Sequence, residues 1–220
     1  ETLGEALSHL GNQNGIIFCN FKESIQRVSD FLEDLGIEHG CFYGGMEQRD
    51  RERSLIKFRN GTYQLLIATD LAARGIDVPE LNFIIHYHLP LREYEFTHRN
   101  GRTARMHKEG TAYVLKWQSE KLPDFIGKIP EAEFPTEPTE PIPSDWATLF
   151  ISGGRKDKIS KGDIAGLLFK IGELKENQVG VIELKQDCAF VSVDRPQAEV
   201  VAATVNNTRL KKKKVRVQVI

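Results

Sequence analysis

The chain has 220 residues, of which 40% are hydrophobic and 28% charged, and its formal net charge is −1. This composition is typical of a globular protein with a core, and the length allows one or two domains. No run of about 18 apolar residues is present, which excludes a membrane-spanning helix. The three cysteines are odd in number and far apart. This argues against a disulfide framework or a metal site and favours a reducing cytoplasm.

The charges divide unevenly along the chain. Residues 1–143 carry 16 Lys and Arg against 22 Asp and Glu, whereas residues 144–220 carry 14 against 9. A basic end indicates an anionic partner such as nucleic acid, although a solvated surface with a chance imbalance would produce the same counts.

The first part of the chain alternates strand and helix patterns. Residues 1–7 lack the order of a signal peptide and read as a helix entered midway, which suggests a piece cut from a longer chain. Short apolar runs predict buried strands, and helical spacing of apolar residues predicts helices between them. The predicted strands are 16–19, 65–68, 83–85 and 111–115, and the predicted helices are 23–35, 47–59 and 91–100. Repeated βα units predict an α/β fold, a parallel sheet with helices on both faces, whose ligands bind at the carboxyl ends of the strands.

A proline-rich segment interrupts this alternation. Five of the nine prolines lie in residues 130–143, among glutamates that repel one another. Because proline removes backbone donors, we expect a semi-stiff linker at residues 130–144. It separates a first domain, residues 1–129, from a second domain, residues 145–220.

The second domain has a different order of elements. The predicted strands are 148–151, 179–184, 188–193 and 215–220, and the predicted helices are 161–171 and 196–205. This order, βαββαβ, is the split βαβ arrangement.

The first domain contains three polar segments at defined positions relative to its predicted strands. Residues 68–77, ATDLAARGID, follow the second predicted strand. Residues 98–105, HRNGRTAR, begin thirty residues after residue 68. Residues 48–51, QRDR, precede both. In this order and spacing they resemble the motifs of the second RecA-like domain of DEAD-box helicases, over residues 16–115.

The resemblance implies a role for each motif. Arg102 and Arg105 would act as arginine fingers on the γ-phosphate of ATP bound to the other RecA-like domain. Because they are three apart, we expect them to share one helix face. His98 would couple the nucleotide to RNA, Asp77 would meet the ATP ribose, and Gly75 would permit a tight turn. The motif residues assigned to RNA are Thr69, Arg74, Arg51 and Gln48.

Some residues favour a structural reading or depart from the family pattern. Arg49, Arg53 and Lys57 fit a solvated helix face, and His86 and His88 fit structural positions at a strand end. The family commonly has Gly, Ile and Thr where this chain has Ala104, Asn100 and Phe21. The missing hydroxyl of Phe21 removes one RNA-phosphate contact.

Two motifs of an ATPase are absent from the sequence. There is no G-x-x-x-x-G-K-[ST] and no Asp-Glu-Ala-Asp. By resemblance, the phosphate cradle and the Mg²⁺ ligands would lie in a preceding N-terminal RecA-like domain. We therefore expect that the 220 residues alone hydrolyse no ATP and that this domain is their partner.

The second domain resembles an RNA-recognition motif. Residues 149–154, LFISGG, resemble its hexamer, and residues 187–193 loosely resemble its octamer. Alternation places Phe150 and Phe190 on the open face, where aromatic rings stack on bases, with Cys188 where an aromatic is usual.

A second resemblance concerns the residues after the first strand of this domain. Residues 151–158, ISGGRKDK, followed by 162–164, resemble the C-terminal domain of DbpA/YxiN-type helicases. The resemblance implies a hairpin of large-subunit ribosomal RNA as substrate and a role in ribosome assembly. The run 211–214 reads equally as an RNA contact or as a solvated hairpin. The basic residues assigned to RNA are Arg155, Lys156, Lys158, Lys161 and Lys212.

The sequence therefore favours the C-terminal part of a monomeric, cytoplasmic, ATP-dependent RNA helicase. Three alternatives stay open: a non-catalytic RNA-binding protein with a helicase-like half, a general RNA helicase without ribosomal specificity, and a DNA helicase of the same superfamily.

Overall fold

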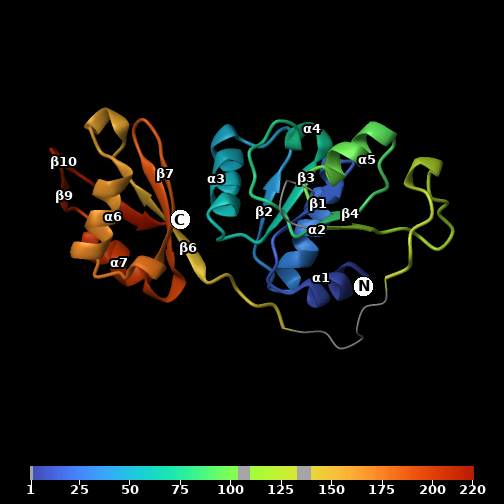
Figure 1. The fold of residues 1–220 in the computed structure, drawn as a ribbon, viewed down its shortest axis with the longest axis horizontal. Helices are drawn as coiled ribbons and strands as arrows, with labels where there is room; N and C mark the ends of the chain where they lie inside the picture. Colours follow the sequence, from blue (N-terminus) through green and yellow to red (C-terminus); the bar gives the residue numbers. More distant parts are fainter. Residues whose placement is uncertain (1, 104–109, 133–139) are drawn as a thin grey trace. The chain divides into compact units, whose positions relative to one another are not determined.

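The computed structural model describes residues 2–103, 110–132 and 140–220 (Figure 1). The chain divides into two compact units, of which the first comprises Glu1–Leu55 with Tyr63–Pro143 and the second Ile56–Thr62 with Ser144–Ile220. Of the predicted linker, residues 133–139 lie outside the described residues, and the described ones belong to no helix or strand. The predicted domain boundaries stay a prediction.

The first unit is built on a five-stranded parallel sheet with the order β2-β3-β1-β4-β5. The strands are β1 (Gly15–Cys19), β2 (His39–Phe42), β3 (Leu65–Thr69), β4 (Phe83–His86) and β5 (Thr111–Val114). The three central strands are almost wholly buried, as their apolar runs predict. The strand β2 was not predicted, because His39 and Gly40 break the apolar pattern of this edge strand.

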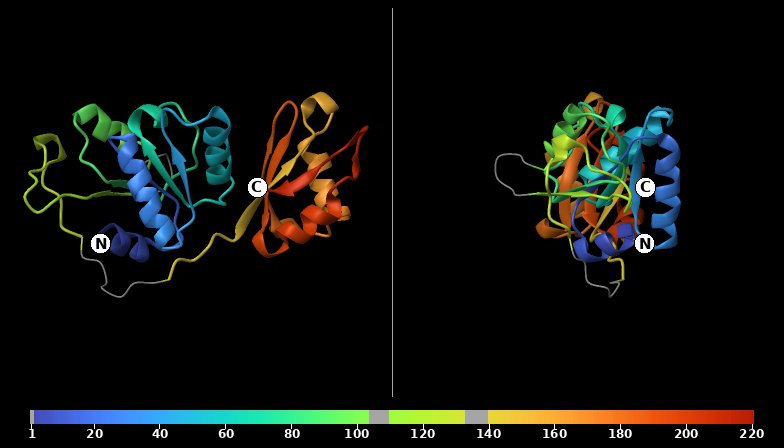
Figure 2. Two further views of the ribbon diagram at one scale, coloured as in Figure 1. Left: turned by 180° about the vertical axis from the view of Figure 1, so that it is seen from behind. Right: turned by 90° about the vertical axis from the view of Figure 1, so that its right-hand side faces the viewer.

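Helices cover both faces of this sheet. They are α1 (Thr2–Leu10), α2 (Lys22–Asp34), α3 (Gln48–Arg59), α4 (Asp70–Ala73) and α5 (Glu93–Asn100), with a 3₁₀ turn at Asp124–Ile126. Apolar residues of α1 and α2 pack on the face that carries Ile17, Ile67 and Ile85. The opposite face carries Phe18 and His86, which contact α5. Figure 2 shows α2, in blue, and α5, in green, on opposite sides of the sheet, and the predicted RecA-like architecture is confirmed.

The second unit contains a four-stranded antiparallel sheet with the order β11-β6-β8-β7. Its strands are β6 (Trp146–Ile151), β7 (Val179–Leu184), β8 (Ala189–Asp194) and β11 (Val217–Val219). Its helices are α6 (Lys161–Lys170) and α7 (Ala198–Val205), with 3₁₀ turns at Arg155–Asp157, Glu176–Gln178 and Arg195–Gln197. The predicted order βαββαβ is confirmed. A short hairpin of β9 (Arg209–Leu210) and β10 (Lys213–Lys214) precedes the last strand.

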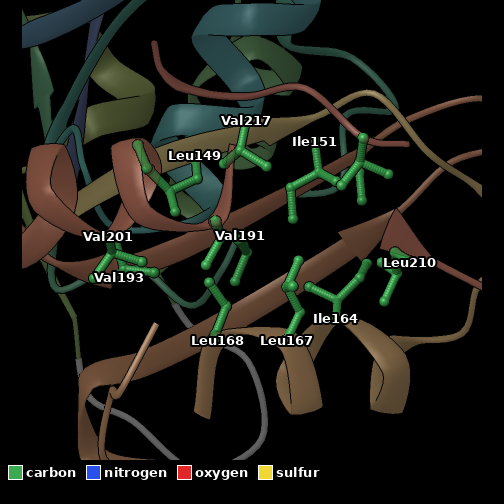
Figure 3. Close-up of a cluster of buried hydrophobic side chains, with 14 of the residues drawn as sticks. Leu149, Ile151, Ile164, Leu167, Leu168, Val191, Val193, Val201, Leu210 and Val217 are labelled. Carbon is green, nitrogen blue, oxygen red and sulfur yellow. The ribbon is translucent and has the colours of Figure 1, made fainter. Parts of the chain in front are cut away.

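The core of the second unit lies between this sheet and its two helices (Figure 3). Leu149 and Val191 point from the sheet toward Leu167 and Leu168 of α6, and all four are buried. The helix α6 begins with a capping box, in which the Ser160 hydroxyl accepts from the Asp163 amide. The helices thus cover one apolar face of the sheet, and the face away from this core carries the half-buried Phe150 and Phe190.

Candidate functional site

A cavity of about 670 Å³ opens at the carboxyl ends of the strands of the first unit. The segment after β3 and the C-terminal end of α5 form its walls, as expected for a parallel sheet. Its lining residues are Phe18, Asp70, Ala73, Arg74, Gly75, Ile76, Asp77, Glu95, Thr97, His98, Arg99, Gly101 and Arg102. Two motifs that lie thirty residues apart in sequence therefore meet at one cavity.

Five of the residues predicted from the motifs line this cavity, namely Asp77, Gly75, Arg74, His98 and Arg102. Gly75 adopts φ +71°, a backbone conformation that favours glycine, and it turns the chain after α4. The neighbouring Arg74 and Asp77 are both exposed. The Arg74 guanidinium lies 5.7 Å from the ring centroid of Tyr94 on α5.

Three other predicted residues do not line the cavity. Thr69 is the last residue of β3, directly before α4. Gln48 is exposed at the start of α3, and the Arg51 guanidinium lies 5.0 Å from the ring centroid of Phe42. The buried Nε of Arg51 has no hydrogen-bond partner among the described residues. The structure does not bring these three residues to the cavity, and their assignment to RNA stays a prediction.

Arg102 does not lie on a helix, so the expectation that Arg102 and Arg105 share a helix face is wrong for Arg102. The helix α5 ends at Asn100, and Gly101 and Arg102 continue as a turn in which the Arg102 amide donates to the Arg99 carbonyl. The Arg102 guanidinium donates to the carbonyls of Ala73 and Ile76, at 2.9 and 3.0 Å. It is thus held against residues 70–77. Arg105 and Ala104 lie outside the described residues.

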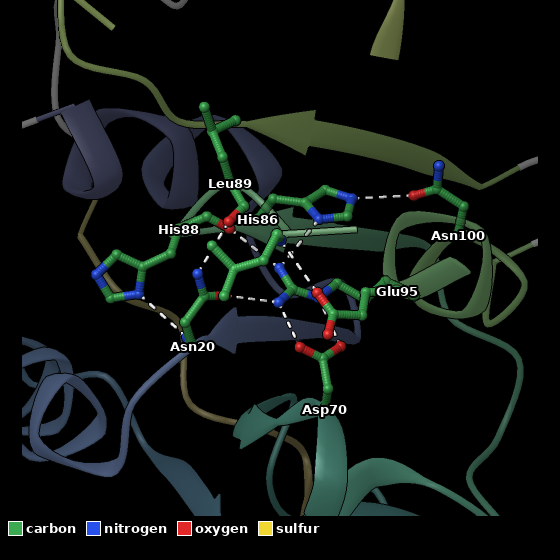
Figure 4. A network of polar contacts seen from close by, with 9 residues as sticks. Asn20, Asp70, His86, His88, Leu89, Glu95 and Asn100 are labelled. Atoms are coloured by element: carbon green, nitrogen blue, oxygen red, sulfur yellow. Dashed lines mark hydrogen bonds and ion pairs between the residues drawn. The ribbon is translucent and has the colours of Figure 1, made fainter. Parts of the chain in front are cut away.

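Arg99 is the buried hub of the site, and sequence reasoning did not single it out (Figure 4). Its side chain is 1% exposed. Its guanidinium forms a bidentate ion pair with Asp70, in which Nε lies 2.7 Å from Oδ1. It also donates to the Asn20 side chain and to the His88 carbonyl, and it lies 5.2 Å from the ring centroid of Phe18. The available signal was that Arg99 and Asp70 stand inside two motifs, next to residues already assigned.

The second unit exposes basic side chains beside the end of β6. Gly154 allows the backbone of this segment to approach the β7–β8 turn closely, because a Cβ at this position would lie only 2.5 Å from the Gln186 carbonyl oxygen. The amides of Arg155 and Lys156 donate to the carbonyls of Lys185 and Gln186, which fixes this segment on the β7–β8 turn. The side chains of the predicted residues Arg155, Lys156, Lys158 and Lys161 are exposed.

Two acidic residues tie the lysine-rich hairpin to this basic segment. The Lys213 ammonium lies 2.9 Å from an Asp157 carboxylate oxygen, and the Lys211 ammonium lies 3.1 Å from Asp163. Hydrogen bonds from the Gly154 amide and from Lys213 lower the pKa of Asp157. Lys212, predicted to bind RNA, is exposed at the hairpin tip. Two basic segments that are distant in sequence thus form one surface.

The face of the second sheet that points away from the core carries a pair of aromatic rings. Phe150 and Phe190 are directly opposite each other on β6 and β8, and their ring centroids lie 5.6 Å apart. Both are half-buried, as is Cys188 beside them. Their placement on the face away from the core agrees with the predicted alternation.

Other kinds of site find little support in the described part of the chain. No group of three or more His, Cys, Asp or Glu residues there could hold a metal ion. No helix in the same residues is long and apolar enough to cross a membrane. All three cysteines are free thiols, and burial raises the pKa of Cys19 to about 12, so this thiol stays protonated.

Comparisons with known proteins agree with both units. Residues 1–107 match the helicase conserved C-terminal domain family, and residues 148–219 match the DbpA RNA binding domain family. A solved structure of the C-terminal domain of the DEAD-box protein Dbp5 is 28% identical, with a TM-score of 0.50, and the match covers 54% of this chain and 69% of that one. The fold and motifs of the first unit therefore define a RecA-like helicase domain.

Curated relatives extend the match over nearly the whole chain. The ATP-dependent RNA helicase DbpA of Bacillus subtilis is 30% identical over 92% of this chain and 48% of its own length. DbpA of Escherichia coli is 31% identical over 93% of this chain and 46% of its own length. The chain belongs to the DbpA-type DEAD-box helicases and spans about half the length of these relatives.

Proposed function

We propose that the chain is the C-terminal half of an ATP-dependent RNA helicase that remodels structured RNA, with a hairpin of large-subunit ribosomal RNA as its target during ribosome assembly. The observation that carries this proposal is the cavity at which residues 70–77 meet the C-terminal end of α5. The exposed basic surface of the second unit supports RNA as the substrate.

The residues at the cavity fit a nucleoside triphosphate. The volume of about 670 Å³ is in the range of cofactor sites. The guanidinium group of Arg102 suits phosphate oxygens of the nucleotide, and the exposed Asp77 carboxylate suits the hydroxyls of a ribose. ATP supplies the phosphoryl group whose transfer to water releases the energy for remodelling. Arg102 stabilises the charge that develops on that group, and His98 links the nucleotide to RNA.

The Mg²⁺ ion that accompanies ATP belongs to another part of the protein in this proposal. The described residues contain no cluster of three metal-ligating side chains, and the sequence contains neither ATPase motif. The magnesium ligands and the phosphate cradle would be supplied by an N-terminal RecA-like domain of the same protein. The 220 residues alone are therefore an inactive ATPase, and we place the protein in the cytoplasm as a monomer.

The second unit targets the motor to its RNA. Arg155, Lys156, Lys158, Lys161 and Lys212 contact phosphates, and the Phe150–Phe190 pair offers a stacking surface on the open sheet. Tethering through the linker raises the local concentration of the motor near its substrate. A general RNA helicase is the second candidate, because basic charge alone does not select one hairpin.

The affinity of the 220-residue chain for two RNAs tests this proposal. We would compare a hairpin of large-subunit ribosomal RNA with a hairpin of equal length and scrambled sequence, at two salt concentrations. We expect a preference for the ribosomal hairpin that persists at the higher salt, because base-specific contacts are less salt-dependent than phosphate contacts. Equal and salt-sensitive binding to both would contradict ribosomal specificity, and absence of RNA binding would contradict the helicase assignment.

A further inference from the structure

Three residues at and just beyond the C-terminal end of α5 bind other parts of the first unit. Arg99 pairs with Asp70 at the start of α4. Arg102 donates to backbone carbonyls farther along the same segment. Asn100 binds His86 at the end of β4, with 3.0 Å between the amide Oδ1 and the ring Nε2 (Figure 4). The segment 70–77 is thus held at two points by α5, and Asn100 ties α5 itself to the sheet.

The hydrogen bonds of His86 admit one neutral form of its ring. Arg99 Nη1 lies 3.3 Å from Nδ1, and a guanidinium nitrogen can only donate, so Nδ1 must accept. The proton of the neutral ring is therefore on Nε2, from which it is donated to Asn100 Oδ1. Figure 4 shows one ring nitrogen of His86 directed at Asn100.

The surroundings of His86 keep this arrangement neutral and dry. The side chain is 0% exposed, and the ring centroid of Phe96 lies 5.1 Å from that of the imidazole. Burial and the nearby charge of Arg99 lower the pKa of His86 to about 4, although Asn100 and Asp70 act in the opposite direction. An unpaired Nε2–H at this position would be a buried donor without an acceptor, which is unfavourable.

We infer that Asn100 is a positioning residue: by accepting the Nε2–H of His86, it keeps Nδ1 available to Arg99 and so sets the placement of residues 70–77 at the cavity. Asn100 touches neither nucleotide nor RNA in this inference. It acts through His86 and Arg99 on Asp70, and through the end of α5 on Arg102. The sequence already marked Asn100 as a departure from the family pattern, and its partner His86 lies fourteen positions earlier. The consequence for ATP hydrolysis rests on the proposed function.

The first test uses the 220-residue chain and does not depend on that function. ¹⁵N NMR of the histidine rings at neutral pH should show His86 as the neutral Nε2–H form. Asn100→Leu, which removes the acceptor at similar volume, should change the ring signals and increase amide hydrogen exchange in residues 70–77. Asn100→Gln, which retains a neutral amide acceptor, should restore exchange to near the wild-type rate. The matched control is Asn12→Leu, the same substitution at an exposed loop residue, and it should change neither signal.

The second test measures RNA-stimulated ATP hydrolysis in the full-length protein. Asn100→Leu should lower kcat roughly tenfold, because displaced catalytic groups lose rate, while KM for ATP changes by less than about twofold. Asn100→Gln should recover most of kcat. A charged or Nδ1–H form of His86 in the wild type, or wild-type exchange in Asn100→Leu, would overturn the inference. If wild-type full-length protein shows no RNA-stimulated hydrolysis, the proposed function fails instead, and the NMR experiment still decides the role of Asn100.

Discussion

Arg99 is a buried charge whose interactions are important for the stability of the site. Arg99 is almost fully buried, whereas its partner Asp70 retains 22% of its side-chain exposure. Burying a guanidinium is costly unless its donors are satisfied, and here they meet a carboxylate, an amide oxygen, a carbonyl and an imidazole nitrogen. The arrangement stabilises one conformation of the segment that follows β3.

Replacing Arg99 by methionine should strongly destabilise the first unit. The substitution leaves Asp70 without its cation and several acceptors without a donor, so we expect the free energy of unfolding to fall by about 3–5 kcal/mol. Urea denaturation of the 220-residue chain would measure this. The control is Arg92→Met, because Arg92 is exposed and its guanidinium contacts the side chain of Tyr94; its effect should stay below about 1 kcal/mol. Equal effects of both substitutions would contradict the proposed importance of burial.

Arg102 differs from Arg99 because its partners are backbone carbonyls at the wall of the cavity. In the full-length protein, Arg102→Ala should lower kcat for RNA-stimulated ATP hydrolysis by about 10³-fold or more, as for other arginine fingers. RNA affinity of the second unit should be unchanged, which an anisotropy titration of the same variant would check. A variant with wild-type kcat would exclude Arg102 as a finger and leave it a structural role.

The buried imidazole of His86 predicts a dependence of stability on pH. Its pKa in the folded chain is lowered to about 4, against an ordinary value of 6.5. The unfolded chain therefore binds the proton first, so the stabilisation is complete above pH 6.5, declines between pH 6.5 and 4, and is constant below. The total loss is about 3 kcal/mol. The groups that face the ring are Arg99, Asp70 and Asn100.

Comparison with His86→Gln isolates this contribution, since glutamine does not titrate. The free energy of unfolding of the wild type should fall relative to that of the variant between pH 6.5 and 4. Parallel pH profiles for the two proteins would show that His86 has an ordinary pKa or is protonated in the folded chain.

At the scale of elements, the basic segment after β6 and the β9–β10 hairpin act as one surface. Two lysines of the hairpin, Lys211 and Lys213, are paired with carboxylates of the second unit, whereas Lys156 and Lys158 are exposed. The paired lysines position the hairpin, so the exposed ones are expected to make the contacts with phosphate. The ion pairs support a structural reading for Lys211 and Lys213, and an RNA contact by Lys212 stays a prediction.

Salt dependence of RNA binding should show whether the exposed lysines after β6 contact phosphate. Lys156→Gln and Lys158→Gln should each reduce the slope of log affinity against log salt by about 0.7–0.9. Lys170→Gln, at the exposed C-terminal end of α6, is the matched control and should leave the slope unchanged. If the control reduces the slope as much as the two variants, the RNA contacts are spread over the unit rather than confined to this surface.

At the scale of the whole molecule, the chain combines a helicase domain with an RNA-binding domain but lacks both ATPase motifs. The 220-residue chain with RNA and ATP should release phosphate at the background rate, because no described cluster holds Mg²⁺ and no phosphate cradle is present in the sequence. The full-length protein under the same conditions should show RNA-stimulated release. Turnover by the 220 residues alone would contradict the proposed division of the active site.

Local patterns in the sequence were sufficient for most elements and for the identity of the motifs. Buried runs such as residues 65–68 and the helical spacing in 23–35 encode strands and helices directly, because burial imposes a period on neighbouring residues. The motif residues Asp77, His98 and Arg102 were assigned from the resemblance to DEAD-box helicases, and the structure places them at one cavity. The edge strand β2 was missed because its pattern is weak, whereas the helix predicted over residues 91–100 does end at Asn100.

Only the tertiary structure decided how these residues are held. Arg99 meets Asp70 across 29 positions and Asn20 across 79, and His86 receives its two partners from another helix. Such pairings depend on which strands are adjacent in the sheet and which face a helix turns toward them, and no local period encodes either. The sequence by itself therefore determined the fold class, the motifs and the basic second domain. Packing over long sequence distances determined that Arg99 is the hub, that Asn100 binds His86, and that two basic segments form one surface.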